Sequence, residues 1–329
     1  MRWAKFYPLF LILKQGNSRF LRTFYDLTCP QVASPNTMES SLLTAVFLPL
    51  ALFIIMLGMG LGLTPMDFQR VLVAPKAVAL GLVAQLIGLP VVGFLLAGLF
   101  PLSPELAVGV IILAACPGGP TSNLMTYLVQ GNVALSITLT AISSLVTVFT
   151  IPLVVNLAMQ QFMGEAAALQ LPFLRTIIQI AVITLVPVSL GMLLRHYAPK
   201  FAAQVEKGVK WLSIAFLTLI IVGLLAKERA NVVNFFLQVG GVALALNIIT
   251  MLLGFAIATV AQLDLRSRKA IAVEVGIQNG TLAIAVASAP TFLDAPTMAI
   301  PAAIYSLMMF ITSAVFVGLM RPASAALEP

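Results

Sequence analysis

The chain has 329 residues, of which 60% are hydrophobic and only 9% are charged, whereas charged residues make up about 25% of an ordinary soluble domain. The segment from Leu106 to Gly164 contains no charged residue, and it is longer than two bilayer crossings of about 20 residues each. Its apolar runs are continuous, whereas a transmembrane β-barrel needs short alternating strands. The sequence therefore excludes a soluble enzyme and predicts an all-α polytopic membrane protein.

Charge-poor runs bounded by charged or Pro/Gly-rich turns predict about nine transmembrane helices. They cover approximately residues 40–62, 73–99, 105–130, 132–160, 170–195, 208–226, 231–262, 268–290 and 296–320. No nucleotide-binding loop interrupts them, so any pumping must draw on an ion gradient. We expect no catalytic residue, no cofactor beyond a coupling ion and no partner protein, since the membrane segments hold no nucleophile–base pair or metal cluster.

The lysines and arginines report orientation in the membrane. They lie in short connections without interleaved aromatic residues, so the net charge of +7 does not indicate nucleic-acid binding. One side carries ten of them, namely Arg70, Lys76, Arg195, Lys200, Lys207, Lys210, Arg266, Arg268, Lys269 and Arg321, and the other carries three, namely Arg175, Lys227 and Arg229. The positive-inside rule makes the first side cytoplasmic and places the C-terminus inside. We expect the protein to lie in a bacterial inner membrane.

A basic N-terminal tail conflicts with this orientation. Residues 1–37 carry Arg2, Lys5, Lys14, Arg19 and Arg22, which would then lie outside. Translation that starts at Met38 would remove the conflict. We therefore divide the chain into a tail of doubtful status (1–37), a transporter domain (38–321) and a short cytoplasmic tail (322–329). Cys29 in the first tail and Cys116 in the membrane are not expected to form a disulfide or a metal site.

Two of the predicted helices contain residues that interrupt a helix. The third contains Cys116-Pro117-Gly118-Gly119-Pro120-Thr121-Ser122-Asn123, and the eighth contains Glu274-Val275-Gly276-Ile277-Gln278-Asn279-Gly280-Thr281. Proline and glycine break the helical hydrogen-bond ladder, although both are common in membrane helices. The two helices are five apart and cross in opposite directions, which is typical of inverted repeats whose discontinuous helices meet at the bilayer centre.

Glu274 is the acidic residue that lies well inside an apolar segment, where a carboxylate costs about 3 kcal/mol. It needs a cation or a proton, unless it reaches back to Lys269 or Arg268. Gln278 would share its helix face if the backbone is still helical there. Other hard oxygen ligands suited to sodium are Ser122, Asn123, Ser136 and Thr140. Ser136 and Thr140 could instead bond to their own helix, and Gln85 and Asn247 could be ligands or interhelical hydrogen-bond partners.

With Gly131-Asn-Val-Ala-Leu-Ser136 and the two interrupted motifs, residues 45–320 closely resemble the bile acid:sodium symporter family. The resemblance implies a core domain with two crossed discontinuous helices, a separate panel domain, and alternating access between them. It implies a first sodium site of Ser122, Asn123, Ser136, Thr140 and Glu274. A second would use Gln85, Glu274, Gln278 and the carbonyls of Val275 and Ile277. Gly280-Thr281 and Met308-Met309-Phe310 depart from the usual family residues near the substrate path.

The sequence as a whole predicts a sodium-coupled symporter of a small organic anion, either a pantoate-like or other carboxylate or a bile-acid-like conjugate. Half-helix N-termini near Thr121 and Asn279 favour an anion, and Gly280 and Thr281 lie beside them. The partners are therefore the organic anion, sodium ions and the lipid bilayer. Alternatives are a proton-coupled carrier, a cation/proton antiporter of similar fold, or a membrane sensor that does not transport.

Overall fold

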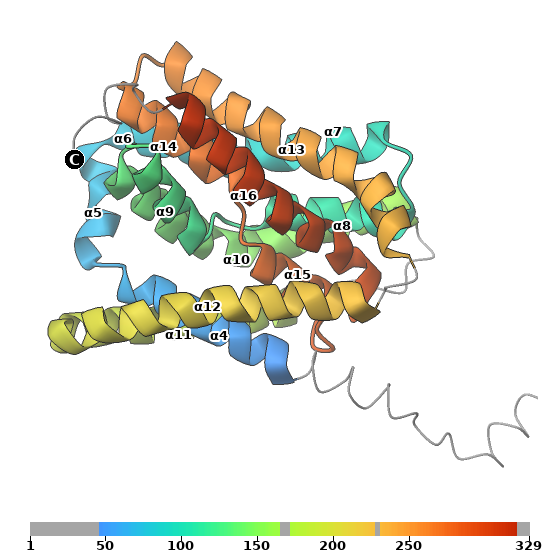
Figure 1. Ribbon diagram of the computed structural model, residues 1–329, viewed down its shortest axis with the longest axis horizontal. Coiled ribbons are helices and arrows are strands. Elements are labelled where there is room, and N and C mark those ends of the chain that lie inside the picture. Colours follow the sequence, from blue (N-terminus) through green and yellow to red (C-terminus); the bar gives the residue numbers. More distant parts are fainter. Residues whose placement is uncertain (1–45, 165–171, 228–230, 321–329) are drawn as a thin grey trace, which may run out of the picture. The chain divides into compact units, whose positions relative to one another are not determined.

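The computed structural model describes residues 46–164, 172–227 and 231–320, and each of the nine expected segments contains helix within these ranges (Figure 1). The elements are α4 (Leu48–Leu61), α5 (Pro65–Val73), α6 (Pro75–Val83), the π-helical turn η2 (Ala84–Gly88), α7 (Leu89–Leu99), α8 (Pro104–Ala115), α9 (Pro120–Leu128), α10 (Val133–Met163), α11 (Phe173–Tyr197), α12 (Pro199–Lys227), α13 (Val232–Val260), α14 (Leu265–Gly276), α15 (Gly280–Ser288), the 3₁₀ turn η3 (Pro296–Ala299) and α16 (Ile300–Met320). The expected tails, Met38 and Cys29 lie outside the described residues.

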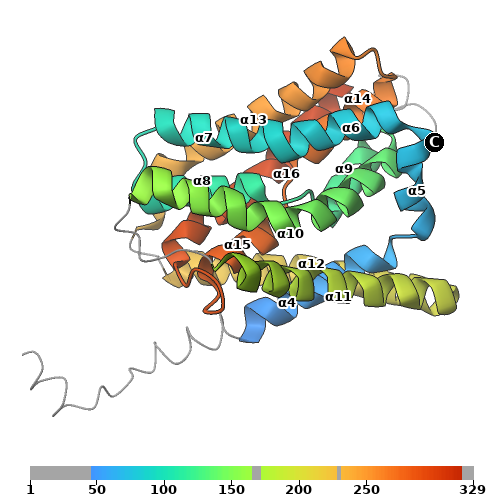
Figure 2. The same ribbon diagram turned by 180° about the vertical axis from the view of Figure 1, so that it is seen from behind.

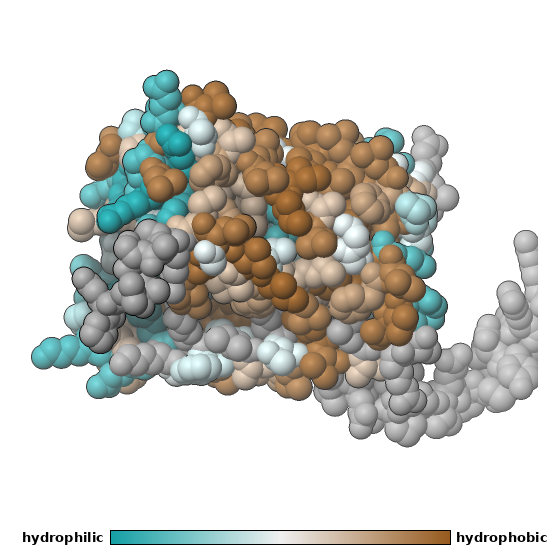
Figure 3. Space-filling view, turned by 45° about the horizontal axis from the view of Figure 1, so that its top comes forward, coloured by the Kyte–Doolittle hydropathy of each residue, from teal (hydrophilic) through white to brown (hydrophobic). Residues whose placement is uncertain are grey.

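Long apolar helices make this an all-α polytopic membrane protein, as the composition predicts. Five helical stretches are long and apolar enough to cross a membrane, and α4 with α5, bent by 61°, would form a sixth. Apolar side chains such as Leu95, Phe149 and Ile311 are more than half exposed. Figure 3 shows hydrophobic residues over the middle of one face and hydrophilic residues gathered toward its ends. The total of nine spans stays a prediction, because interrupted helices such as α8–α9 are short in each half.

The helices α4, α11 and α12 pack against one another as a separate layer. They run side by side in both views of the ribbon (Figures 1 and 2). Their backbones approach closely at Gly60 and Gly191, where an added methyl group would overlap the facing backbone. Small residues allow such close helix packing in membranes. The other helices pack around α8, α13 and α14, and the two interrupted helices lie in this second group.

Several basic connections meet at one end of the described molecule. The Lys76 amine donates to the carbonyl of Ala261 at 2.7 Å, and the backbone N–H of Asn132 donates to the carbonyl of Arg266 at 2.9 Å. The Lys269 amine donates to the carbonyl of Met320 at 2.8 Å. These contacts join three connections, α5–α6, α9–α10 and α13–α14, and the end of α16. The charge distribution assigns all four of these locations to the same side of the membrane.

The structure adds helix where the sequence predicts connections, first as α5, which lies between the expected segments 40–62 and 73–99. α12 begins at Pro199 rather than near 208, because the basic stretch after it continues the helix instead of forming a connection. Proline suits the first turn of a helix, where its missing N–H would have no helical partner. Pro152 and Pro187 lie inside α10 and α11 without ending them. Such prolines are tolerated in membrane helices, where neighbouring groups satisfy the freed carbonyls.

Candidate sodium site

The two helix breaks lie directly against each other. α8 ends before Cys116 and α9 begins at Pro120, while α14 ends at Gly276 and α15 begins at Gly280. Gly118 and Gln278 form an isolated antiparallel bridge. Both predicted breaks are therefore confirmed, and their extended backbones pair with each other. Their relation as inverted repeats stays a prediction.

Glu274 is fully buried on α14, and three hydroxyl groups from two other helices surround its carboxylate. Ser122 on α9 and Ser136 on α10 donate to Oε2 at 2.8 and 2.9 Å. Thr140, one turn further along α10, donates to Oε1 at 2.6 Å. The three hydroxyls are themselves buried. The structure thus brings together four of the five residues expected in the first sodium site through direct contacts with the carboxylate.

The alternative in which Glu274 reaches back to a basic residue is wrong. The Lys269 amine instead donates to the carbonyls of Val129 and Met320, at 3.0 and 2.8 Å. Lys269 thereby places its charge where α9 and α16 end, which is favourable at helix C-termini. Within the described ranges, Glu274 takes part in no ion pair. A buried carboxylate without a counter-charge is strongly unfavourable, so this site calls for a cation or a proton.

The hydroxyls around Glu274 have more acceptors within reach than they have protons. The Thr140 hydroxyl lies 3.0 Å from the carbonyl of Ser136 and 3.5 Å from Oδ1 of Asn123, besides its contact with Glu274. Because a hydroxyl has one proton and two lone pairs, it donates to one of these oxygens at a time. Bonding of Thr140 to its own helix therefore competes with its bond to Glu274, and both acceptors lie within reach of the hydroxyl. The surplus of oxygen acceptors, with half-buried Asn123 at its edge, suits a hard cation.

A second group of amides and carbonyls lies beside the breaks. Nε2 of Gln85 donates to Oε1 of Gln278 at 2.7 Å and to the carbonyl of Cys116 at 3.2 Å. Nε2 of Gln278 donates to the carbonyl of Val275 at 2.7 Å. Gln85 lies on η2, and such π-helical turns occur often at functional sites. Its Oε1 is buried and has no partner among the described residues.

Gln278 does not share a helix face with Glu274, as it would on a continuous helix. α14 ends at Gly276, and Ile277 has the extended angles φ −120° and ψ 105°. The extended backbone turns Gln278 toward Gln85 rather than toward the hydroxyl cluster. The expected ligands of the second sodium site, Gln85, Gln278 and Val275, are therefore linked by hydrogen bonds, while the carboxylate of Glu274 contacts the first set.

Comparison with known proteins gives the family. The family described as "Sodium Bile acid symporter family" matches residues 49–235 of the chain. A sodium-dependent transporter of Bacillus subtilis, YocS, is 35% identical over 260 residues, which cover 79% of this chain and 78% of that protein. The chain belongs to the sodium bile acid symporter family.

Other relatives in this family are longer. A "Probable sodium/metabolite cotransporter BASS1, chloroplastic" of Arabidopsis thaliana is 30% identical over 82% of this chain and 65% of its own length. "Sodium/bile acid cotransporter 5" of Rattus norvegicus is 29% identical over 83% of this chain and 65% of its own length. The chain thus spans about two thirds of these two proteins. Membership of the symporter family makes the protein a membrane transporter and not an enzyme.

The residues expected to bind substrate differ in accessibility. Thr121 is partly exposed in the first turn of α9. Asn279, Gly280 and Thr281 are buried, and Gly280 packs so closely against Ser306 that a methyl group would overlap its hydroxyl. Oδ1 of Asn279 accepts a hydrogen bond from the amide of Leu282 at 3.0 Å, so this side chain caps α15. In this conformation Thr121 is the accessible member of the four.

Two supporting residues, Thr126 and Tyr305, escape the sequence analysis. Thr126 donates from α9 to the hydroxyl of Ser136 at 3.2 Å, and its spacing of four residues from Ser122 is a signal that could have found it. The hydroxyl of Tyr305 and the amide of Asn247 donate to the carbonyl of Gly276, at 2.8 and 2.6 Å. Asn247 is thus a hydrogen-bond partner between helices. Nothing in the apolar sequence around Tyr305 points to its role.

Proposed function

We propose that this member of the sodium bile acid symporter family carries a small organic anion together with sodium ions. The observation that supports the proposal is the fully buried carboxylate of Glu274, which meets three hydroxyls and no basic side chain among the described residues. Sodium entering this cluster would supply the missing positive charge. The hydroxyl protons would turn to the neighbouring carbonyls, and the hydroxyl lone pairs would face the ion.

Two sodium ions are proposed, one in each set of oxygens. Ser122, Asn123, Ser136, Thr140 and Glu274 would bind the first. Gln85, Gln278, Glu274 and the carbonyls of Val275 and Ile277 would bind the second. The unpartnered Oε1 of Gln85 supports the second site, because a buried acceptor without a partner costs free energy that a cation would recover.

The proposed substrate is a carboxylate such as a pantoate-like acid, or a bile-acid-like conjugate of the kind named for the rat relative. The partly exposed N-terminus of α9 at Thr121 offers backbone N–H groups and the positive end of a helix dipole to an anion. With two sodium ions and one monoanion, one net charge enters per cycle. A membrane potential of 100 mV, negative inside, would then add about 2.3 kcal/mol to uptake.

Alternating access would move the layer of α4, α11 and α12, as a panel, against the group of helices that holds the two breaks. The proposed orientation places the end with Lys76, Arg266 and Lys269 in the cytoplasm, together with the C-terminus, in a cell inner membrane. This arrangement is supported by the meeting of these basic connections at one end.

Thermal unfolding in sodium and in potassium tests the cation site, because a ligand that binds only the folded state raises its stability. We expect sodium to raise the unfolding temperature of the native protein above its value in potassium. The unfolding temperature of Glu274→Gln should be the same in both salts. Glu105→Gln is the matched control, since Glu105 lies partly exposed in the first turn of α8. It should respond to sodium as the native protein does.

Uptake into proteoliposomes separates sodium coupling from the alternative. A sodium gradient should drive accumulation of labelled carboxylates at constant pH, and Glu274→Gln should abolish it. If a pH gradient drives uptake without sodium, the proton-coupled carrier is the correct function, with Glu274 carrying the proton. If sodium binds but neither gradient moves any of the tested anions, the proposed substrate class is wrong.

A further inference from the structure

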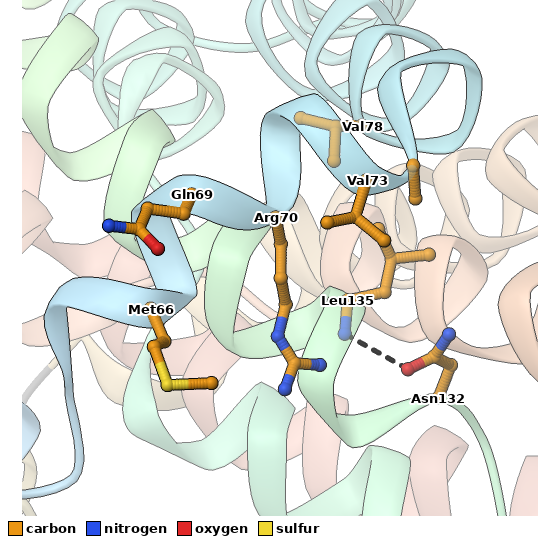
Figure 4. A pocket seen from close by; sticks show the side chains of 8 residues that line it. Met66, Gln69, Arg70, Val73, Val78, Asn132 and Leu135 are labelled. Carbon is orange, nitrogen blue, oxygen red and sulfur yellow. Dashed lines mark hydrogen bonds between the residues drawn. The ribbon is translucent and has the colours of Figure 1, made fainter.

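A cavity of about 350 Å³ lies between α5, the start of α6 and the start of α10 (Figure 4). Its apolar lining residues are Met66, Val73, Ala74, Val78 and Leu135, and its polar ones are Gln69, Arg70 and Asn132. The volume falls at the lower end of the range of about 300–1,000 Å³ for small-molecule sites. A mostly apolar lining with one guanidinium suits an amphiphilic ligand, which carries an oxyanion group on an apolar moiety.

The charge of Arg70 is available to such a ligand. Nε of Arg70 forms an ion pair with Oδ1 of Asp67 at 3.9 Å, a separation too long for a hydrogen bond, and the Arg70 side chain is 40% exposed. Oδ2 of Asp67 accepts from the amide and the hydroxyl of Thr64, at 2.8 and 2.7 Å, at the start of α5. Figure 4 shows the Arg70 side chain extending from α5 into the space between Met66 and Leu135.

Three neighbouring basic side chains at this end donate to carbonyls within the protein. Lys76 donates to the carbonyl of Ala261, and Arg268 donates to the carbonyl of Leu263 at 2.6 Å. Lys269 is held by two carbonyls where helices end. These contacts stabilise helix C-termini. Arg70 differs from all three because its guanidinium makes no hydrogen bond within the described part of the chain, has the long ion pair with Asp67, and faces a cavity.

The position of α5 points to the membrane surface as the source of the ligand. α5 follows the 61° bend after α4 and exposes Leu72 by 85% and Val73 by 82% beside Arg70. A short helix with exposed apolar residues and a basic residue suits the plane between lipid headgroups and acyl chains. The excess of basic residues assigns this end to the cytoplasmic leaflet, whose lipids are anionic.

We propose that this cavity binds the headgroup of an anionic phospholipid. Arg70 donates to the phosphate, exposed Gln69 donates to the headgroup, and Met66 and Val73 contact the glycerol and the start of an acyl chain. α5 connects the layer that contains α4 to the helices of the interrupted group, and its first turn is joined to α10 by the hydrogen bond from Thr138 to the carbonyl of Asp67, 2.8 Å long. A bound lipid therefore braces the connection between the two groups of helices.

Native mass spectrometry of the detergent-purified protein, titrated with phosphatidylglycerol or phosphatidylcholine, tests this proposal. We expect the native protein to retain one phosphatidylglycerol preferentially. Arg70→Gln should bind it roughly tenfold more weakly, as loss of a charge-assisted hydrogen bond predicts. Arg175→Gln is the control, because Arg175 is an exposed arginine at the start of α11, on the side that the charge distribution assigns to the outside. It should bind phosphatidylglycerol as the native protein does.

Two further arms make the result decisive. Arg70→Gln should keep its stabilisation by sodium, which shows that the variant is folded and that the cation site is intact. Glycerol phosphate, added at the same concentration as the lipid, should not compete. Equal retention of phosphatidylglycerol by the native protein and Arg70→Gln would overturn the proposal, and competition by glycerol phosphate would make the cavity a site for soluble anions instead.

Discussion

Gly118 lies against the carboxylate of Glu274, so that a methyl group added to the glycine would overlap Oε1. Gly118 also pairs with Gln278 through its backbone. One residue therefore sets both the separation of the two helix breaks and the space left for the carboxylate. Glycine is required here by a close approach and not by an unusual backbone angle.

We expect Gly118→Ala to abolish the sodium-dependent rise in unfolding temperature, because the methyl group must displace Glu274 from its hydroxyl partners. Gly119→Ala is the matched control, since its nearest new contacts are with Asn279 at 3.6 Å or more, an ordinary van der Waals separation. A full sodium response in Gly118→Ala would show that the position of the carboxylate does not control ion binding.

Removing single hydroxyls should weaken sodium binding, because each hydroxyl would contribute an oxygen lone pair to the bound ion. We expect Thr140→Val and Ser136→Ala each to raise the half-saturating sodium concentration by roughly tenfold, which corresponds to about 1.4 kcal/mol of binding free energy. Ser144→Ala provides the control on the same helix, because the Ser144 hydroxyl donates to the backbone carbonyl of Thr140, at 2.7 Å. The half-saturating sodium concentration of each of the three variants is measured by following the unfolding temperature during a sodium titration.

The second group of oxygens should determine how many sodium ions bind. We expect Gln85→Leu to keep sodium-dependent stabilisation but to reduce the Hill coefficient of sodium-driven uptake toward one, since the Glu274 cluster would still bind an ion. The exposed Gln238 on α13 offers the control substitution Gln238→Leu. If the Hill coefficient of Gln85→Leu stays above one and equals that of the native protein, Gln85 is not a ligand of the second sodium ion.

Tyr305 should act as a positioning residue for the end of α14. Tyr305→Phe removes a hydrogen bond to the carbonyl of Gly276 and leaves the one from Asn247, at a cost of about 1 kcal/mol. We expect a several-fold loss of sodium affinity in titrations. Ser306→Ala, on the same helix, removes a hydroxyl that donates to its own helix at Ala302. A loss of stability in potassium with no change in sodium affinity would make Tyr305 purely structural.

The layer of α4, α11 and α12 should be sensitive to a single added methyl group. An alanine at Gly191 would meet the backbone of Leu57 and Gly60, and overpacking of this kind costs about 1–3 kcal/mol. We expect Gly191→Ala to lower the unfolding temperature equally in sodium and potassium. Gly318→Ala has open space around it and should be neutral or stabilising, because alanine favours helices. Equal stability of the two variants would refute the close contact.

The sequence alone determined the membrane class, the two helix breaks and the residue that needs a cation or a proton. These properties are local: an apolar run partitions into lipid wherever it occurs, and the prolines and glycines around Cys116 interrupt backbone hydrogen bonds whatever surrounds them. Glu274 attracts attention because it is a carboxylate in such a run. The oxygen ligands near it could be proposed from their chemistry and from the family resemblance.

Only the tertiary structure decided which of these groups meet. Ser122, Ser136 and Thr140 lie 134–152 residues from Glu274 in the chain, so the packing of α9, α10 and α14 sets their distances. The end of α14 at Gly276 moved Gln278 off the helix face that an unbroken helix would give it. The cavity beside Arg70 likewise arises from the packing of three helices. Local rules fix where a backbone can be helical, whereas side-chain contacts between distant helices depend on how those helices pack.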